Sequence, residues 1–265
     1  MKKSMLFAVL ALSAVTVSAA EVIEIKTTKD WAKGSYVRPQ SDGSWVIPGT
    51  RDLSSAKSFK VDPAKKYTLS FDVRKSAGSQ KVFFYAGFWA LNEDMVRIAP
   101  HNVRCEHNSE TILTADAAAG SKSIRITEPK RWKKGAKAWC VALSDKKTCN
   151  APDMSVICNT GCGEQAADGS MEVMLKAPLP KDYKANTPVH FHSEGPGLYA
   201  VCSEKDPSTE WETVSATITG IQSFGSAIKL NQWWPGSKYG KLRFLVLTSD
   251  RQAKVELRNI KLTIE

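Results

Sequence analysis

Three patterns are missing from the 265 residues, and each absence excludes a class of protein. No apolar run after the first 20 residues is long enough to cross a bilayer, which excludes helical membrane spans from the rest of the chain. Helical periodicity is nearly absent, which argues against a helical fold. There is no G-x-S-x-G motif and there are only four histidines, so the sequence shows no sign of a serine acyltransferase.

The N-terminus has the three parts of a secretory signal peptide. Lys2 and Lys3 precede an apolar run, 5–17, and small residues that end at Ala20. Cleavage near Ala20 would start the mature chain near Glu21, and a retained anchor is the alternative. We therefore expect a secreted, periplasmic or cell-surface protein. Its formal charge of +10 at pH 7 favours anionic glycans, anionic lipids or cell-wall polymers as partners over nucleic acid.

Alternating apolar and polar residues predict an all-β protein. In the segment KYTLSFDVRK, the residues Tyr67, Leu69, Phe71 and Val73 share one face, and polar residues share the other. The next segment, KVFFYAGFWAL, carries apolar or aromatic groups on both faces, although a strand of a sandwich needs only one buried face. Similar strands are predicted near the C-terminus, in ETVSATITG, KLRFLVLTSD and KVELRNIKLTIE.

The middle of the chain differs in composition, with most of the cysteines, several prolines and the basic stretch PKRWKKGAK, which we interpret as a charged turn. Short strands are predicted at 123–127 and 136–143. We expect a small β-subdomain, 113–195, inserted into a β-sandwich made of 21–112 and 196–265. Two tandem β-domains would leave the C-terminal strands with too few partners to bury a face.

An even number of cysteines in an exported chain predicts disulfides. Up to three bonds, in any of fifteen pairings, could form. A metal cluster is the competing interpretation, but Cys158-x3-Cys162 lacks a matching second pair or a nearby histidine. The disulfide candidates are Cys105, Cys140, Cys149, Cys158, Cys162 and Cys202.

Four segments carry a resemblance to a known family: FKVDPAKKYTLSFDVRKS, TEWETVSATITG, LRFLVLTSD and VELRNIKLTIE. Together they resemble the jelly-roll carbohydrate-binding modules, of galactose-binding-like type, that are appended to secreted polysaccharide-degrading enzymes. The resemblance implies a jelly-roll sandwich. It also implies a site in which aromatic rings stack on the apolar faces of sugar rings while polar groups bind the hydroxyls.

We expect such a site to use residues from two strands and one loop. If both strands belong to a concave sheet, their outward residues form one site; if they belong to a convex sheet, the insert covers the aromatic face. Two adjacent tryptophans cannot both face one core from an extended chain, so at least one should be partly exposed, whereas Trp211 is expected in the core. The candidate carbohydrate-binding residues are Asp72, Arg74, Tyr85, Trp89, Trp233, Trp234 and Tyr239.

No catalytic residue and no metal ligand is predicted. The E-x-D-x-x-E run of jelly-roll glucanases is absent. His190 and His192 share a strand face and could hold a metal with Glu194, but alternating polar residues are ordinary on an exposed strand. His101 and His107 are expected in solvent. No cofactor is expected, and a structural calcium ion is left open without a location.

The sequence therefore predicts an exported, non-catalytic carbohydrate-binding protein whose partner is a polysaccharide or surface glycan, with a preference for anionic chains. No nucleic acid and no integral membrane contact is expected, and the oligomeric state is open. One alternative is a structural or adhesive cell-envelope protein that binds another protein. A less favoured alternative is a polysaccharide hydrolase or lyase with an unrecognised site.

Overall fold

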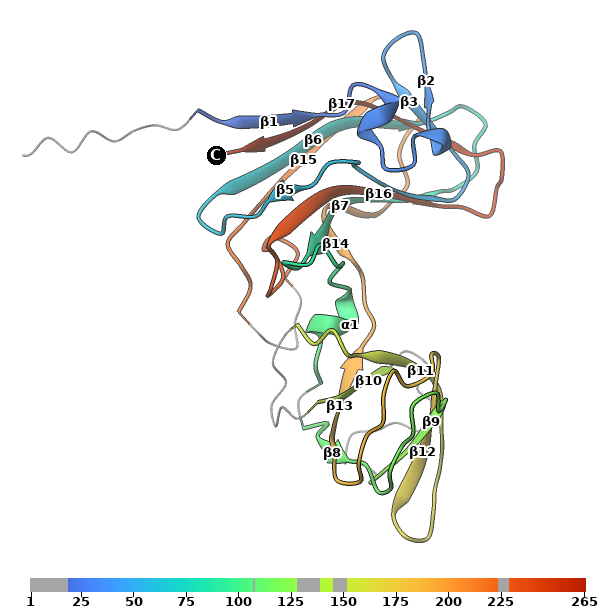
Figure 1. Cartoon of the computed structure of the whole chain (residues 1–265). Coiled ribbons are helices and arrows are strands. Elements are labelled where there is room, and N and C mark those ends of the chain that lie inside the picture. Colours follow the sequence, from blue (N-terminus) through green and yellow to red (C-terminus); the bar gives the residue numbers. More distant parts are fainter. Residues whose placement is uncertain (1–18, 107, 128–138, 145–151, 224–228) are drawn as a thin grey trace, which may run out of the picture.

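A computed structural model describes residues 19–106, 108–127, 139–144, 152–223 and 229–265. The described chain is all-β apart from short helical turns, and two antiparallel sheets pack face to face as a sandwich (Figure 1). A third, separate sheet lies at the opposite end of the molecule, below the sandwich in this view. No helix in the described part is long and apolar enough to span a membrane.

The first sheet has the order β15-β6-β17-β3-β2, with β1 added at β17. Its strands are β1 (Glu21–Glu24), β2 (Arg38–Pro39), β3 (Trp45–Pro48), β6 (Lys66–Lys75), β15 (Glu212–Thr219) and β17 (Lys254–Ile264). The second sheet has the order β14-β7-β16-β4, with β5 added at β16. Its strands are β4 (Arg51–Ser54), β5 (Phe59–Lys60), β7 (Phe83–Leu91), β14 (Leu198–Lys205) and β16 (Tyr239–Leu247).

The sandwich core lies between these two sheets. On β6 the residues Tyr67, Leu69, Phe71 and Val73 are all buried, as the alternation predicts. Phe71 packs edge-on against Phe84 of β7, with ring centroids 5.9 Å apart. Burying a large apolar side chain contributes about 1.5–3 kcal/mol, so these inward positions determine which face of each strand is turned to solvent.

The third sheet has the order β8-β13-β10-β11-β12-β9 and its own apolar core. Its strands are β8 (Thr111–Ile112), β9 (Ser123–Thr127), β10 (Trp139–Leu143), β11 (Ile157–Gln165), β12 (Ser170–Leu175) and β13 (Pro188–Ser193). Strand β9 pairs with β12, and β13 pairs with both β8 and β10. The third sheet is therefore formed by its own six strands and contains no strand of the sandwich. The stretch 128–138, which includes most of the basic run, lies outside the described residues.

Short helical turns occur in the connections. Two are 3-10 helices near the N-terminus, η1 (Thr28–Asp30) and η2 (Gly34–Tyr36). The third, α1 (Pro100–Val103), lies between the sandwich and the third sheet (Figure 1). The side chain of Asn102 caps α1 by accepting from the Ala99 amide at 2.7 Å, and it donates to the carbonyl of Asp153 at 2.8 Å. These bonds tie α1 to the segment that leads into β11.

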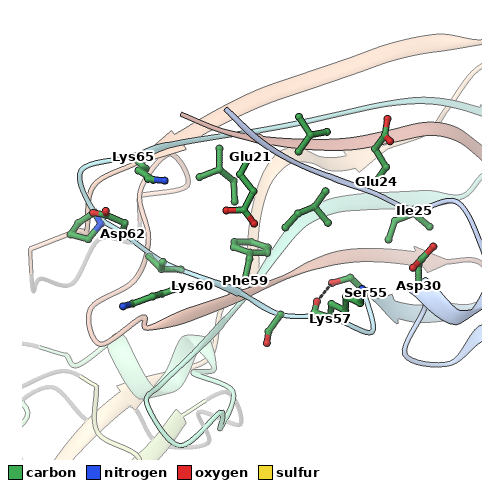
Figure 2. A pocket seen from close by; sticks show the side chains of 16 residues that line it. Glu21, Glu24, Ile25, Asp30, Ser55, Lys57, Phe59, Lys60, Asp62 and Lys65 are labelled. Carbon is green, nitrogen blue, oxygen red and sulfur yellow. Dashed lines mark hydrogen bonds between the residues drawn. The ribbon is translucent and has the colours of Figure 1, made fainter. Parts of the chain in front are cut away.

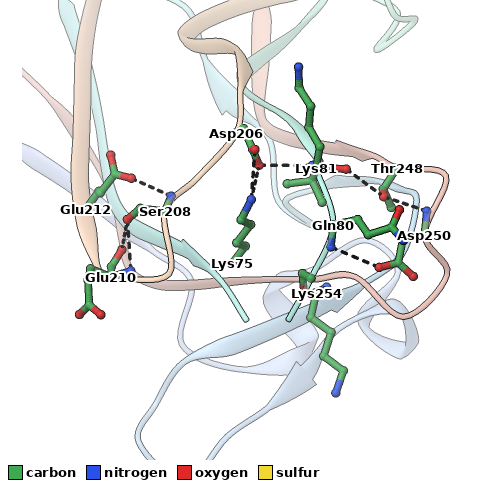
Figure 3. Close-up of polar contacts among 12 residues, drawn as sticks. Lys75, Gln80, Lys81, Asp206, Ser208, Glu210, Glu212, Thr248, Asp250 and Lys254 are labelled. Atoms are coloured by element: carbon green, nitrogen blue, oxygen red, sulfur yellow. Dashed lines mark hydrogen bonds and ion pairs between the residues drawn. The ribbon is translucent and has the colours of Figure 1, made fainter. Parts of the chain in front are cut away.

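Polar contacts join three connections at one end of the sandwich (Figure 3). The ammonium of Lys75 contacts both carboxylate oxygens of Asp206, at 3.0 and 3.1 Å. Glu212 accepts from the Ser208 amide at 2.9 Å and pairs with Lys205 at 2.6 Å. These contacts fix the segment between β14 and β15, which carries the chain from the second sheet of the sandwich to the first.

The disulfide prediction is wrong for three of the six cysteines. Cys140, Cys158 and Cys202 are free thiols. No disulfide joins two of the described cysteine side chains, and Cys149 lies outside the described residues. The third sheet has its own packed apolar core.

Candidate functional site

The outward face of β7 carries aromatic residues. Phe84, Ala86 and Phe88 point into the core, which leaves Tyr85 and Trp89 half-buried on the opposite face of the strand. This placement follows from strand alternation alone. The face is therefore available to a ligand only where the neighbouring strands leave it open.

Strand β14 crosses this face at Gly87. The register between β14 and β7 shifts between Leu198 and Cys202, so four steps of β14 lie against two steps of β7. A methyl group added at Gly87 would collide with the carbonyl oxygen of Leu198 and lie 2.7 Å from the amide nitrogen of Ala200. The space over Gly87 is therefore filled by the backbone of β14, which separates a Trp89 side of the aromatic face from a Tyr85 side.

An arginine lies between the two sides. The guanidinium of Arg243 on β16 is 5.7 Å from the ring centroid of Trp89 and 4.9 Å from that of Tyr199. It also forms two hydrogen bonds with the carboxylate of Asp52, at 2.9 and 2.8 Å. Because a bidentate pair satisfies both charges, Arg243 acts as a rigid support for the rings and contributes little net charge to a ligand.

A pocket of about 440 Å³ lies on the Tyr85 side. Tyr85 and Tyr199 form one wall, with ring centroids 4.8 Å apart. The Tyr85 hydroxyl donates to the carboxylate of Glu204 at 3.4 Å. The remaining lining residues are Gly195, Pro196, Gly197, Ser203, Leu245 and Leu247.

The surroundings of the pocket affect the pKa values of its two tyrosines, and the backbone of Glu204 adopts an uncommon conformation. Burial, helped by the nearby Glu204 carboxylate, raises the pKa of Tyr85, and burial raises the pKa of Tyr199. Both phenols are therefore protonated donors at neutral pH. Glu204 has a φ of 56°, a left-handed conformation that costs a non-glycine residue about 1–3 kcal/mol. Strain of this size is commonly retained where a side chain must be aimed at a ligand.

The predicted residues Asp72 and Arg74 do not join this site. They lie on the outward face of β6, and β6 and β7 belong to different sheets. Since both strands turn their apolar faces to the shared core, their outward faces lie on opposite sides of the sandwich. The guanidinia of Arg74 and Arg258 instead lie 4.4 and 4.2 Å from the ring centroid of Trp211, and Asp72 pairs with Arg258 at 3.0 Å. Trp211 is therefore half-buried on an outer face, and its predicted place in the core is wrong.

The expectation that one tryptophan of the pair is exposed is also wrong. Trp233 is 0% and Trp234 2% exposed. The chain is not extended there: the Ser237 amide donates to the carbonyl of Trp234 at 3.2 Å, and Gly236 has a φ of 78°. A turn directly after the pair lets both rings enter the core, where Trp233 packs against Tyr67. Tyr239 is half-buried at the start of β16, away from the pocket lining.

A larger cavity of about 910 Å³ lies between β1 and β5, at the open edge of the sandwich. Figure 2 shows acidic and basic side chains around it, including Glu21, Asp62, Lys60 and Lys65. Its aromatic residue is Phe59, which is 6% exposed and packs into the core against Trp233. The cavity therefore offers no ring on which a sugar could stack, and we favour the smaller pocket.

The histidines also differ from the expectation. His190 and His192 are each only 2% exposed, and Nδ1 of His192 lies 2.6 Å from the carbonyl oxygen of His101. His101 is half-buried on α1, and not in solvent, while His107 lies outside the described residues. Glu194 does approach a histidine, but that histidine is His101.

A group of metal-binding side chains gathers at this junction. The group consists of His101, Cys140, Cys158 and Glu194. Each offers one ligand atom, and these four atoms all lie within 4.8 Å of one another. Burial raises the pKa of both thiols.

Sequence reasoning did not identify Tyr199, Ser203 or Glu204 of the pocket. The alternation in LYAVCSEK was a signal for a strand with Tyr199 and Ser203 on one face, but nothing in the sequence shows that this strand bulges over Gly87. Comparison with family models, curated proteins and solved structures finds no match to this chain.

Proposed function

We propose that the chain is an exported, non-catalytic carbohydrate-binding protein of the jelly-roll kind. The proposal is carried by the pocket in which Tyr85 and Tyr199 form an aromatic wall beside the Glu204 carboxylate. Aromatic rings next to fixed hydrogen-bonding groups are the chemistry that pairs with a sugar, which has apolar C–H faces and hydroxyl edges. The volume of about 440 Å³ lies within the usual range for a small-ligand site.

The local charges change the expected ligand. Glu204 is the carboxylate of the pocket lining, and the guanidinium of Arg243, beside Tyr199, is already paired with Asp52. A carboxylate repels a uronate or sulfate, whereas it accepts hydrogen bonds from neutral hydroxyls. We therefore propose an uncharged, hydroxyl-rich sugar, although the net charge of the chain alone favoured an anionic one.

Binding without hydrolysis fits the same geometry. Glycoside hydrolysis requires two carboxyl groups flanking the scissile bond, about 5–9.5 Å apart, and the lining of this pocket supplies one, Glu204. A single aromatic wall contributes on the order of 1–3 kcal/mol. Even with a few hydrogen bonds of about 0.5–1.5 kcal/mol each, one such pocket should therefore bind weakly, with a Kd in roughly the millimolar range.

Retention of the purified mature protein on a panel of immobilised neutral and anionic glycans tests the proposal. We expect retention on at least one neutral glycan, lost in Tyr85→Ala and in Glu204→Gln. Tyr36→Ala is the matched control, because Tyr36 is 41% exposed and lies outside the pocket lining. No retention on any glycan, or equal retention by Tyr85→Ala and wild type, would overturn the assignment.

Salt dependence separates the two kinds of glycan. Because the proposed contacts are uncharged stacking and hydrogen bonds, raising the ionic strength from about 0.05 to about 0.5 M should leave retention almost unchanged. Retention on anionic glycans that disappears at high salt would instead assign the interaction to the overall positive charge. Retention that does not require Tyr85, together with copurification of an envelope protein, would favour the structural or adhesive alternative.

A further inference from the structure

Four segments that are distant in the sequence bring metal-binding side chains to one point. His101 comes from α1, Cys140 from β10, Cys158 from β11, and Glu194 follows β13 directly. Cys140 and Cys158 are direct partners in the pairing of β10 with β11, and β10 also pairs with β13. The sheet register therefore places the two cysteines side by side, Glu194 lies two residues after His192, the β13 partner of Cys140, and α1 adds the histidine.

Two distances from the sulfur of Cys158 are close to those of a tetrahedral metal site. The sulfur of Cys158 lies 3.8 Å from Nδ1 of His101 and 3.2 Å from a carboxylate oxygen of Glu194. Bonds of about 2.3 Å to sulfur and about 2.0–2.2 Å to nitrogen and oxygen imply separations of roughly 3.4–3.8 Å between ligand atoms at tetrahedral angles. Both distances lie within a few tenths of an ångström of that range.

The supporting contacts hold two of the ligands in place. The backbone of Arg104 accepts from the Ser193 amide at 3.0 Å, and its guanidinium donates to the carbonyl of Glu194 at 3.1 Å. His192 contacts the carbonyl oxygen of His101 at 2.6 Å. Outer contacts that orient ligating residues are typical of protein metal sites.

We propose that His101, Cys140, Cys158 and Glu194 form a zinc site that joins α1 to the third sheet. Two thiolates, an imidazole and a carboxylate in a closed four-ligand set suit tetrahedral Zn²⁺, because zinc accepts mixed sulfur, nitrogen and oxygen ligands. A set that contains a carboxylate suits Cu(I) less well, since Cu(I) prefers sulfur. The role is structural: the ion would fix the third sheet relative to the sandwich, next to the Gly195 end of the proposed sugar pocket.

A disulfide between Cys140 and Cys158 is the competing arrangement, because the two residues are cross-strand partners and the chain is expected to be exported. The structure contains both as free thiols. A disulfide would use neither His101 nor Glu194, whereas the metal site accounts for all four side chains.

The test is a titration of the reduced, metal-free mature protein with Co²⁺, which reports tetrahedral thiolate coordination by its visible and charge-transfer absorption. We expect one Co²⁺ per chain, displaced by Zn²⁺. Cys158→Ser should weaken binding by more than about 100-fold, since even changes outside the ligand shell cost roughly 10–100-fold. Glu194→Gln is the second variant. Glu194 is exposed, so this change should leave the apolar core intact.

Cys202→Ser is the matched control, because Cys202 is a free thiol in the sandwich and outside the group. It should bind Co²⁺ as the wild type does. Absence of thiolate bands in the wild type, or equal bands in Cys158→Ser, would overturn the proposal. So would a Cys140–Cys158 disulfide found by peptide mapping of non-reduced protein taken from the exported fraction.

Discussion

Replacing Gly87 by alanine tests the unexpected feature of the sandwich, the passage of β14 over the outward face of β7. The added methyl group would collide with the carbonyl oxygen of Leu198 and lie 2.7 Å from both the Ala200 nitrogen and the Tyr199 Cα. These atoms belong to the backbone, so no side-chain rotation relieves the clash. Strand β14 would have to move away from β7.

The destabilisation expected for Gly87→Ala can be estimated from substitutions that add a group to a packed core. Inserting a methylene into a well-packed site typically costs about 1–3 kcal/mol, and we expect the upper end, about 3 kcal/mol, because backbone must shift. For a domain of this size, that corresponds to a fall in Tm of roughly 6–12 °C. The same shift would displace Tyr199 from the pocket wall, so glycan retention should fall as well.

Denaturant unfolding followed by tryptophan fluorescence measures the effect, because Trp233 and Trp234 lie in the sandwich core. Gly163→Ala is the control: it is also a strand glycine, and its added methyl would lie 3.5 Å or more from its neighbours, which is ordinary contact. Equal unfolding free energies for the two variants would refute the crossing of β14 over Gly87.

Two further predictions concern stability. Trp233→Ala should lower the unfolding free energy by about 3–5 kcal/mol in a urea titration, because the side chain is fully buried, whereas Phe83→Ala, 39% exposed, should cost less than about 1 kcal/mol. Hydrogen bonding to Lys205, with backbone support, lowers the pKa of Glu212 from 4.5 to about 2. The folded state thus favours the carboxylate, so Glu212 stabilises above pH 4.5 and loses this effect as pH falls from 4.5 to about 2. With Glu212 34% exposed, Glu212→Gln should cost about 1 kcal/mol at pH 7 and nothing near pH 2; an equal cost at both would contradict the assignment.

The presence of β-strands could be predicted from the sequence because the alternation of apolar and polar residues is a local property of each strand. The buried face of β6, from Tyr67 to Val73, agrees with the predicted one, and β9 has the predicted bounds, Ser123–Thr127. An all-β sandwich with additional small strands could therefore be predicted from residue spacing alone.

Which strands share a sheet could not be predicted in this way. Alternation shows which residues share a face of one strand, but it does not show which strands pair with that strand. Asp72 and Tyr85, thirteen positions apart, were therefore expected in one site, whereas they lie on opposite faces of the sandwich. The exposure expected for Trp233 or Trp234 failed because it assumed an extended chain, whereas a turn follows Trp234. Long-range pairing also brings His101 to Cys158, which no local pattern shows.

Amide hydrogen exchange with and without a retained neutral glycan tests the central claim most directly, because it locates the ligand on the chain. Sugar bound between Tyr85 and Glu204 should slow exchange in the segment 195–204, which forms one side of the pocket. Exchange in the segment 57–65, which lines the larger cavity between β1 and β5, should not change. Protection confined to 57–65, or no protection in 195–204, would contradict the account.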